Sequence, residues 1–195
     1  KTGVSVREQL DIFDYLTALK LQNPERVILL TGNHDLHYIK GATQTYTGYQ
    51  WLHAAEISSK ITHAYRHGLL QAAYQQGSYL CVHAGITRTW SKNFGINPAN
   101  AADSVNALFR QQIRPFEFLR QPGCKSNGNN IHQGPFWVRP DSLRADGIPG
   151  YTQVIGHTQF AEPQFLPGII AMDALSFCSK YLIINQKDEA TLADI

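Results

Sequence analysis

Three short motifs in this sequence carry side chains that can bind a metal ion or transfer a proton. They are Gly32–Asp35 (GNHD), Val82–Gly85 (VHAG) and Gly156–Thr158 (GHT). Each motif follows an apolar run that predicts a buried strand. The amide oxygen of an asparagine can ligate a metal, and histidine is both a common metal ligand and a proton donor near neutral pH. Sites in open α/β sheets form just beyond the carboxyl ends of strands, so the three motifs together indicate a metal-dependent hydrolase.

The elements that position the first motif are readable from local signals. Ser5 and Glu8 form a capping box, and apolar residues then recur at helical spacing, which predicts a helix over about 5–21. The apolar run 26–31 is predicted to be the first strand. Helix, loop and strand in this order form half of a βαβ unit.

The other elements are predicted from apolar runs and breaker residues. We expect strands at 78–83 and 152–156, one or two helices over 51–76, mostly helix over 98–119, a hairpin-like pair from 168–173 and 180–185, and irregular loops at 38–50 and 121–130. Early strands separated by helices and closely spaced late strands favour a mixed α/β class. The expected architecture is a two-layered mixed β-sheet sandwich flanked by helices.

Size and composition narrow the classes of protein. A chain of 195 residues is long enough for one domain with a full core, and its net charge of +2 gives no reason to expect nucleic acid or an anionic membrane as a partner. No apolar stretch approaches the roughly 18 residues of a membrane span. Cys81, Cys124 and Cys178 form no spaced pair, and Cys81 and Cys178 lie in apolar runs. Buried free thiols are therefore expected, which suits a cytoplasmic location.

GNHD, VHAG and GHT in this order resemble the motifs of the calcineurin-like metallophosphoesterase superfamily. The match is to its phosphoprotein phosphatase branch, including the bacterial members. The separations of 50 residues from Asn33 to His83 and 74 from His83 to His157 are also similar to that branch. The resemblance covers nearly the whole chain and implies a single domain over residues 1–195.

The resemblance implies specific roles for five residues. Asn33, His83 and His157 would ligate one of two divalent metal ions, which could be Mn, Fe or Zn. His34 would be the general acid that protonates the leaving oxygen, and Arg139 would bind the phosphate. Two cations about 3.5–4 Å apart can activate a water for in-line displacement, and the planar fork of an arginine suits a phosphate.

The chain departs from that pattern at its beginning. The family motifs D-x-H, on a first strand, and G-D-x-x-D would stand before the helix at 5–21, and neither is present there. We therefore expect an N-terminally truncated domain that lacks a first strand and the ligands of one metal. Such a chain would hold at most one weakly bound ion and would be inactive or nearly so.

The predicted function is a phosphoprotein-phosphatase-like phosphomonoesterase acting on a phosphorylated protein or a small phosphoester. One alternative is a dinucleoside polyphosphate (diadenosine tetraphosphate) hydrolase, and another is a non-catalytic scaffold with a degenerate site. Secondary candidates are Arg144 for the phosphate, His37 near the substrate, and the aromatic loop 43–51 for stacking a base. His63 and His67 have metal-ligand spacing, although an exposed helix face explains them better.

Overall fold

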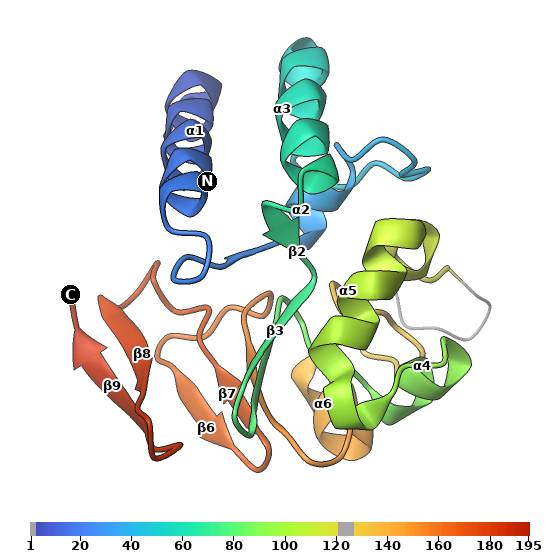
Figure 1. Cartoon of the computed structure of the whole chain (residues 1–195), viewed down its shortest axis with the longest axis vertical. Helices are drawn as coiled ribbons and strands as arrows, with labels where there is room; N and C mark the ends of the chain where they lie inside the picture. The colour runs from blue at the N-terminus through green and yellow to red at the C-terminus, as the bar shows by residue number, and fades with distance from the viewer. Residues whose placement is uncertain (1–2, 121–126) are drawn as a thin grey trace.

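A five-stranded mixed sheet forms the centre of the fold (Figure 1). The computed structural model describes residues 3–120 and 127–195. In spatial order the strands are β3 (Ala73–Gln76), β4 (Tyr79–Val82), β5 (Thr152–Ile155), β7 (Ile169–Ala171) and β6 (Gln164–Leu166). The inner strands β4, β5 and β7 run parallel, whereas β3 and β6 run antiparallel to their neighbours. This arrangement confirms the predicted mixed α/β class, with a mixed sheet flanked by helices.

Two smaller sheets accompany the central one. β1 (Leu29–Leu30) pairs in parallel with β2 (Leu70–Gln71), and β8 (Lys180–Ile184) pairs in antiparallel fashion with β9 (Ala190–Asp194). The predicted pairing of 168–173 with 180–185 was wrong. β7 is buried along its whole length and lies between β5 and β6, whereas β8 is only partly covered and has β9 as its partner. The strand predicted at 26–31 is confined to two residues.

The first helix begins as the sequence predicts. α1 (Val6–Gln22) starts at a complete capping box, in which the Glu8 amide donates to Ser5 Oγ at 3.2 Å and the Ser5 amide donates to Glu8 Oε2 at 2.8 Å. Its apolar face is only partly covered within the described residues. Leu10 is buried, but Leu16 is 38% exposed and Ile12 is 55% exposed.

A helical interpretation of 51–76 holds only for its first part. η1 (Trp51–His53) leads into α3 (Ala54–Arg66), whose Ile57 and Ile61 are buried one turn apart. The chain then turns at Gly68, which has a φ of +69°, and forms β2 and β3. These strands depend on distant partners, which local helix propensity does not report.

Most of the remaining helices are short. They are α2 (Asn33–Leu36), α4 (Arg88–Asn93), η2 (Pro98–Asn100), α5 (Ala101–Gln111), η3 (Arg114–Phe116) and α6 (Pro140–Asp146). α4, α5 and α6 lie together on one side of the central sheet (Figure 1). The break predicted at Pro115 lies within η3, after α5 has ended. α5 contacts β3 through Asn106, which accepts hydrogen bonds from the amides of Ala72 and Ala73.

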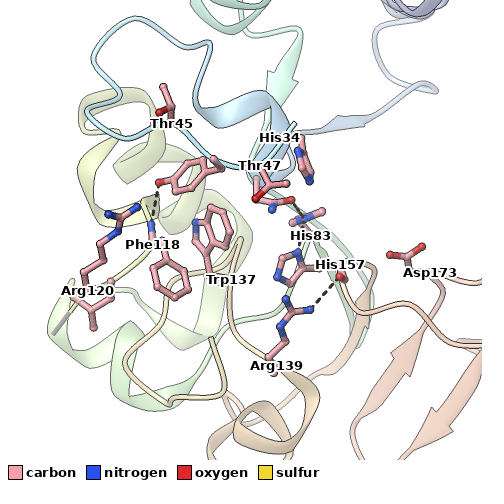
Figure 2. A pocket seen from close by; sticks show the side chains of 13 residues that line it. His34, Thr45, Thr47, His83, Phe118, Arg120, Trp137, Arg139, His157 and Asp173 are labelled. Carbon is pink, nitrogen blue, oxygen red and sulfur yellow. Dashed lines mark hydrogen bonds between the residues drawn. The ribbon is translucent and has the colours of Figure 1, made fainter. Parts of the chain in front are cut away.

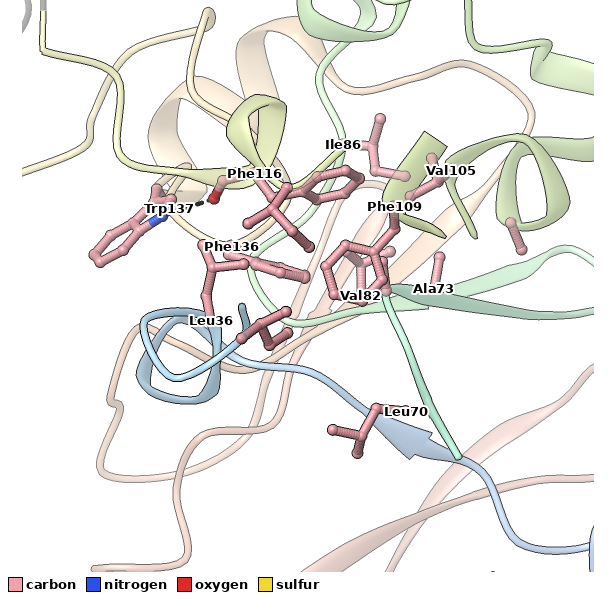
Figure 3. Packing of buried hydrophobic residues seen from close by; sticks show 14 of the residues in the cluster. Leu36, Leu70, Ala73, Val82, Ile86, Val105, Phe109, Phe116, Phe136 and Trp137 are labelled. Carbon is pink, nitrogen blue, oxygen red and sulfur yellow. Dashed lines mark hydrogen bonds between the residues drawn. The ribbon is translucent and has the colours of Figure 1, made fainter. Parts of the chain in front are cut away.

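An aromatic core underlies the strand ends that carry the motifs (Figure 3). Phe109, Phe116 and Phe136 pack edge to face or at a tilt, with ring centroids 4.9 to 5.7 Å apart, and all three are at most 1% exposed. Leu36 joins the same cluster and is fully buried. Through Leu36, α2, which carries the first motif, is therefore packed against this core.

The described residues also test two expectations from composition. Within 3–120 and 127–195, no helix combines the length and apolar character that a membrane span requires. Cys81 and Cys178 are free thiols, but each is half-buried rather than fully buried. Burial raises the pKa of the Cys81 thiol to about 11, so it is protonated at neutral pH. Cys124 and the first part of the loop predicted at 121–130 lie outside the described residues.

Candidate functional site

The carboxyl ends of three strands bring the three motifs to one place. β4 and β5 are parallel neighbours with Val82 opposite Ile155, and the Gly156 amide continues the ladder by donating to the His83 carbonyl at 2.9 Å. His83 and His157 therefore emerge side by side. Asn33 reaches the same place from the end of β1, because it is the first residue of α2.

Polar atoms from all three motifs converge. His83 Nε2 lies 2.8 Å from Asn33 Oδ1 and 3.2 Å from His157 Nδ1 (Figure 2). Two imidazole nitrogens and one amide oxygen thus form a compact donor set. In the part of the chain that the structure describes, no group of three or more His, Cys, Asp or Glu side chains could hold a metal ion. Any ion held here would depend on the asparagine amide as well.

The electrostatic environment keeps both imidazoles neutral. Burial, reinforced by electrostatic interaction with His34 and Arg139, lowers the pKa of His83 to about 4. Burial and the neighbouring His83 lower the pKa of His157 to about 3. His157 Nε2 is buried and has no hydrogen-bond partner among the described residues. Neutral imidazoles keep a lone pair, which is the form that ligates metals.

Backbone conformation at the motifs permits this close approach. A Cβ on Gly32 would lie 3.1 Å from His83 Cε1 and Nδ1, so only a glycine lets the ring lie against this backbone without displacement. His157 has a φ of +63°, a left-handed conformation that is costly for a residue other than glycine. Its carbonyl oxygen accepts a hydrogen bond from Arg139 Nη1 at 3.3 Å. This bond helps to hold the strained residue.

Arg139 is fixed beside the two histidines. Its Nε donates to the Asn127 carbonyl at 2.7 Å, and Nη1 also donates to Thr158 Oγ1 at 3.1 Å. Among the described residues, no acceptor forms a hydrogen bond with Arg139 Nη2, so this nitrogen can donate to an anion in the cavity. Arg144, the competing candidate, is exposed, forms a 3.8 Å ion pair with Asp141 and does not line this cavity.

The remaining motif residues separate into different environments. His34 is exposed and lines the cavity, with its ring close to Gly48. Asp35 accepts a hydrogen bond from the Gly32 amide at 2.8 Å and so has a structural use at the start of α2. His37 is buried against Tyr38 and Tyr49, and it lines a smaller neighbouring cavity rather than the one at the motifs.

The site opens into a cavity of about 930 Å³, lined by residues from seven segments of the described chain. Sequence reasoning did not assign several of them to the site: Thr45, Thr47, Phe118, Arg120, Trp137 and Asp173 (Figure 2). Of the aromatic loop, Tyr46 lines the cavity, whereas Tyr49 and Trp51 do not, and Trp51 is 73% exposed. No local signal marks these residues, because the tertiary fold alone brings them together.

Solved structures with the same fold are phosphatases. The chain is similar to a point mutant of a cold-active protein tyrosine phosphatase, with a TM-score of 0.61 and 17% identity over 96% of this chain. It is also similar to the cold-active protein-tyrosine phosphatase of a psychrophilic Shewanella species, with a TM-score of 0.57 and 16% identity over 93% of this chain. At these identities the likeness establishes the fold alone. The chain spans 62% and 64% of the two neighbours' lengths. No protein-family model matches the sequence.

Proposed function

We propose that this protein is a metal-dependent phosphoester hydrolase that acts on phosphomonoesters. The observation that carries the proposal is the convergence of Asn33 Oδ1, His83 Nε2 and His157 Nδ1 beside the guanidinium of Arg139. A neutral donor set next to a fixed cation suits a phosphate bound to a metal ion. The fold shared with phosphatases supports the same class.

The donor set fits a divalent ion of the Mn, Fe or Zn type. Two imidazole nitrogens and an amide oxygen are a mixed set that such ions accept. A bound ion would supply Lewis-acid activation of water and would neutralise phosphoryl charge. Three donors are fewer than the four of a closed zinc site, so we expect this chain to hold one ion weakly. The two-metal form implied by the resemblance needs further ligands, and we expect the 195 residues alone to turn over very slowly.

Arg139 and His34 have separable roles in this proposal. Arg139 binds and orients the phosphate, because its Nε and Nη1 are already held by protein acceptors and its position is therefore fixed. His34 is exposed at the same cavity and can deliver a proton to the leaving oxygen. His83 and His157 are poorly suited to that task, because their lowered pKa values leave both rings neutral at neutral pH, and a neutral imidazole is too weak an acid to protonate the leaving oxygen.

Metal binding tests the proposal directly. Isothermal titration with Mn²⁺ or Zn²⁺ should detect one weak site in the native chain, and this site should be lost in His83→Ala and His157→Ala. His53→Ala is the matched control, because His53 is exposed and lies outside the cavity. The exposed residues His63 and His67, whose ring centroids lie 4.2 Å apart, could also bind the added metal. This background binding is the same in all variants and cancels when they are compared. Unchanged titrations in both site variants would end the proposal.

The cavity also favours a second candidate, a dinucleoside polyphosphate hydrolase. Tyr46, Phe118 and Trp137 give it an aromatic wall, and Arg120 and Arg139 give it positive charge. Such a wall can stack a nucleobase. Competition between diadenosine tetraphosphate and p-nitrophenyl phosphate in the Mn²⁺-supplemented enzyme separates the two functions. Preferential hydrolysis of the dinucleotide would favour this second candidate.

A further inference from the structure

The cavity is far larger than a phosphate group requires. Its volume of about 930 Å³ is near the upper end of the range for small-molecule sites, roughly 300–1,000 Å³. Arg139, His83 and His157 occupy one end, and Arg120 lies on the other side of Trp137 (Figure 2). The space beyond the phosphate is therefore large enough for another part of a substrate.

The wall between the two ends is aromatic and preformed. The Tyr46 ring lies 4.3 Å from Trp137, and Phe118 meets Trp137 edge to face at 5.2 Å. Trp137 Nε1 donates to the Phe116 carbonyl at 3.0 Å, and the Tyr46 hydroxyl accepts the Phe118 amide at 3.1 Å. Rings held in this way offer a rigid apolar surface, which favours a flat aromatic group as the neighbouring ligand.

The segment that carries Arg120 is anchored by a buried glutamine. Gln133 is fully buried, and its Oε1 accepts the Leu119 amide while its Nε2 donates to the Leu119 carbonyl, both at 3.0 Å. The residue before Arg120 is thus held as if by a neighbouring strand. Arg120 itself is exposed. Burial raises the pKa of the Tyr46 hydroxyl to about 12, and the positive charge of Arg120 has a smaller effect that lowers it.

Arg120 has no ion-pair partner among the described residues, 3–120 and 127–195. The carboxylate nearest in sequence, Glu117, is buried and accepts hydrogen bonds from the amides of Thr43 and Gln44, although its charge also acts on the Tyr46 hydroxyl. The cavity lining holds two arginines and a single carboxylate, Asp173, which lies on the far side of His157 from Arg120 (Figure 2). An anionic group that reached Arg120 would meet a guanidinium with which no carboxylate of the described residues forms an ion pair.

We propose that Arg120 and the aromatic wall form a second-anion subsite. This inference rests on the proposed phosphoester activity and names its substrate class: a phosphate ester of an aromatic alcohol that carries a further negative charge beyond the ring. Arg139 binds the phosphate, the ring lies along Tyr46, Phe118 and Trp137, and Arg120 pairs with the distal anion.

Binding to the metal-free chain tests the subsite without requiring turnover. The probes are 4-carboxybenzylphosphonate and its uncharged counterpart 4-carbamoylbenzylphosphonate, which differ only in the distal charge. A second pair of probes carries one more methylene before the distal group, so that the distal group can reach Arg120 if the first pair is too short. The dissociation constants are measured by titration calorimetry at low salt for the native chain, Arg120→Gln and the control Arg144→Gln. Arg144 is a suitable control because it is exposed and lies outside the cavity.

We expect the carboxylate of at least one pair to bind about fivefold more tightly than its amide, as one partly exposed charge pair gives. Arg120→Gln should reduce this ratio to about one without changing affinity for the amide, and Arg144→Gln should retain it. Equal affinities for charged and uncharged probes, no binding at all, or a ratio that survives Arg120→Gln would each overturn the assignment. If Arg120→Gln weakens the binding of the charged and uncharged probes equally, Arg120 binds the phosphonate rather than the distal anion, and the assignment is overturned as well. Metal titration reports separately on the proposed activity, so the two failures are distinguishable.

Discussion

One buried and two half-buried imidazoles should make the stability of this protein sensitive to mild acid. Burial lowers the pKa of His37 and of His83 to about 4, and burial together with the neighbouring His83 lowers that of His157 to about 3. In the unfolded chain each imidazole titrates near 6.5. Between these values the unfolded state binds more protons than the folded state, so the free energy of unfolding falls as the pH falls.

The size of the effect follows from the pKa difference. One imidazole with a pKa of about 4 in the folded state and 6.5 in the unfolded state loses about 2 kcal/mol of stability between pH 7 and pH 5. Three such groups should lower the free energy of unfolding by at least about 3 kcal/mol over this range, a large part of the 5–15 kcal/mol typical of domains. Asp35 acts in the opposite direction, because burial raises its pKa.

Urea unfolding at pH 7, 6 and 5 in the presence of a chelator measures this dependence. His37→Asn keeps an acceptor for the Tyr46 amide, which His37 Nδ1 accepts at 3.2 Å, and should remove about 2 kcal/mol of the difference between pH 7 and pH 5. His53→Asn controls for loss of an exposed histidine. A native chain whose unfolding free energy is flat from pH 7 to pH 5, or a His37→Asn chain with an unchanged slope, would refute the reasoning.

Two further substitutions test how the site is supported. Gly85→Ala should destabilise the fold by about 1–3 kcal/mol, since Gly85 has a φ of +115° and an added Cβ would overlap Leu143. Thermal unfolding measures this loss, and a melting temperature equal to the native value would contradict it. Gln133→Leu should cost about 2–4 kcal/mol, because the amide and carbonyl of half-buried Leu119 both lose their partner on the buried Gln133. A shift below about 0.5 kcal/mol in urea unfolding would show that water replaces the glutamine.

The parts of the fold that local chemistry determines were predictable from sequence. The Ser5–Glu8 capping box set the start of α1 within one residue, and the strands before His83 and His157 lie where their apolar runs predict. The meeting of His83 and His157 also followed, because β4 and β5 are parallel neighbours that end at the same edge of a sheet, whereas Asn33 arrives from β1 of a separate small sheet. The metal, acid and phosphate roles of these residues remain proposals.

The errors arose where distant partners decide the structure. β2 and β3 lie in an alanine-rich stretch that reads as helix, and they exist because β1, β4 and Asn106 supply their hydrogen bonds. β8 was assigned the wrong partner for the same reason. Arg120 and Trp137 could not be assigned to the cavity from sequence, since they lie 37 and 20 residues from the nearest histidine of the site, His83 and His157 respectively.

The placement of the motifs has a mechanical consequence. Asn33 follows the small β1–β2 sheet, whereas His83 and His157 follow strands of the large sheet. An ion or phosphate that contacts all three side chains ties the two sheets together, so that separating them would require releasing the ligand first. Occupancy of the site should therefore suppress amide hydrogen exchange in β1 and β2, well beyond the residues that touch the ligand.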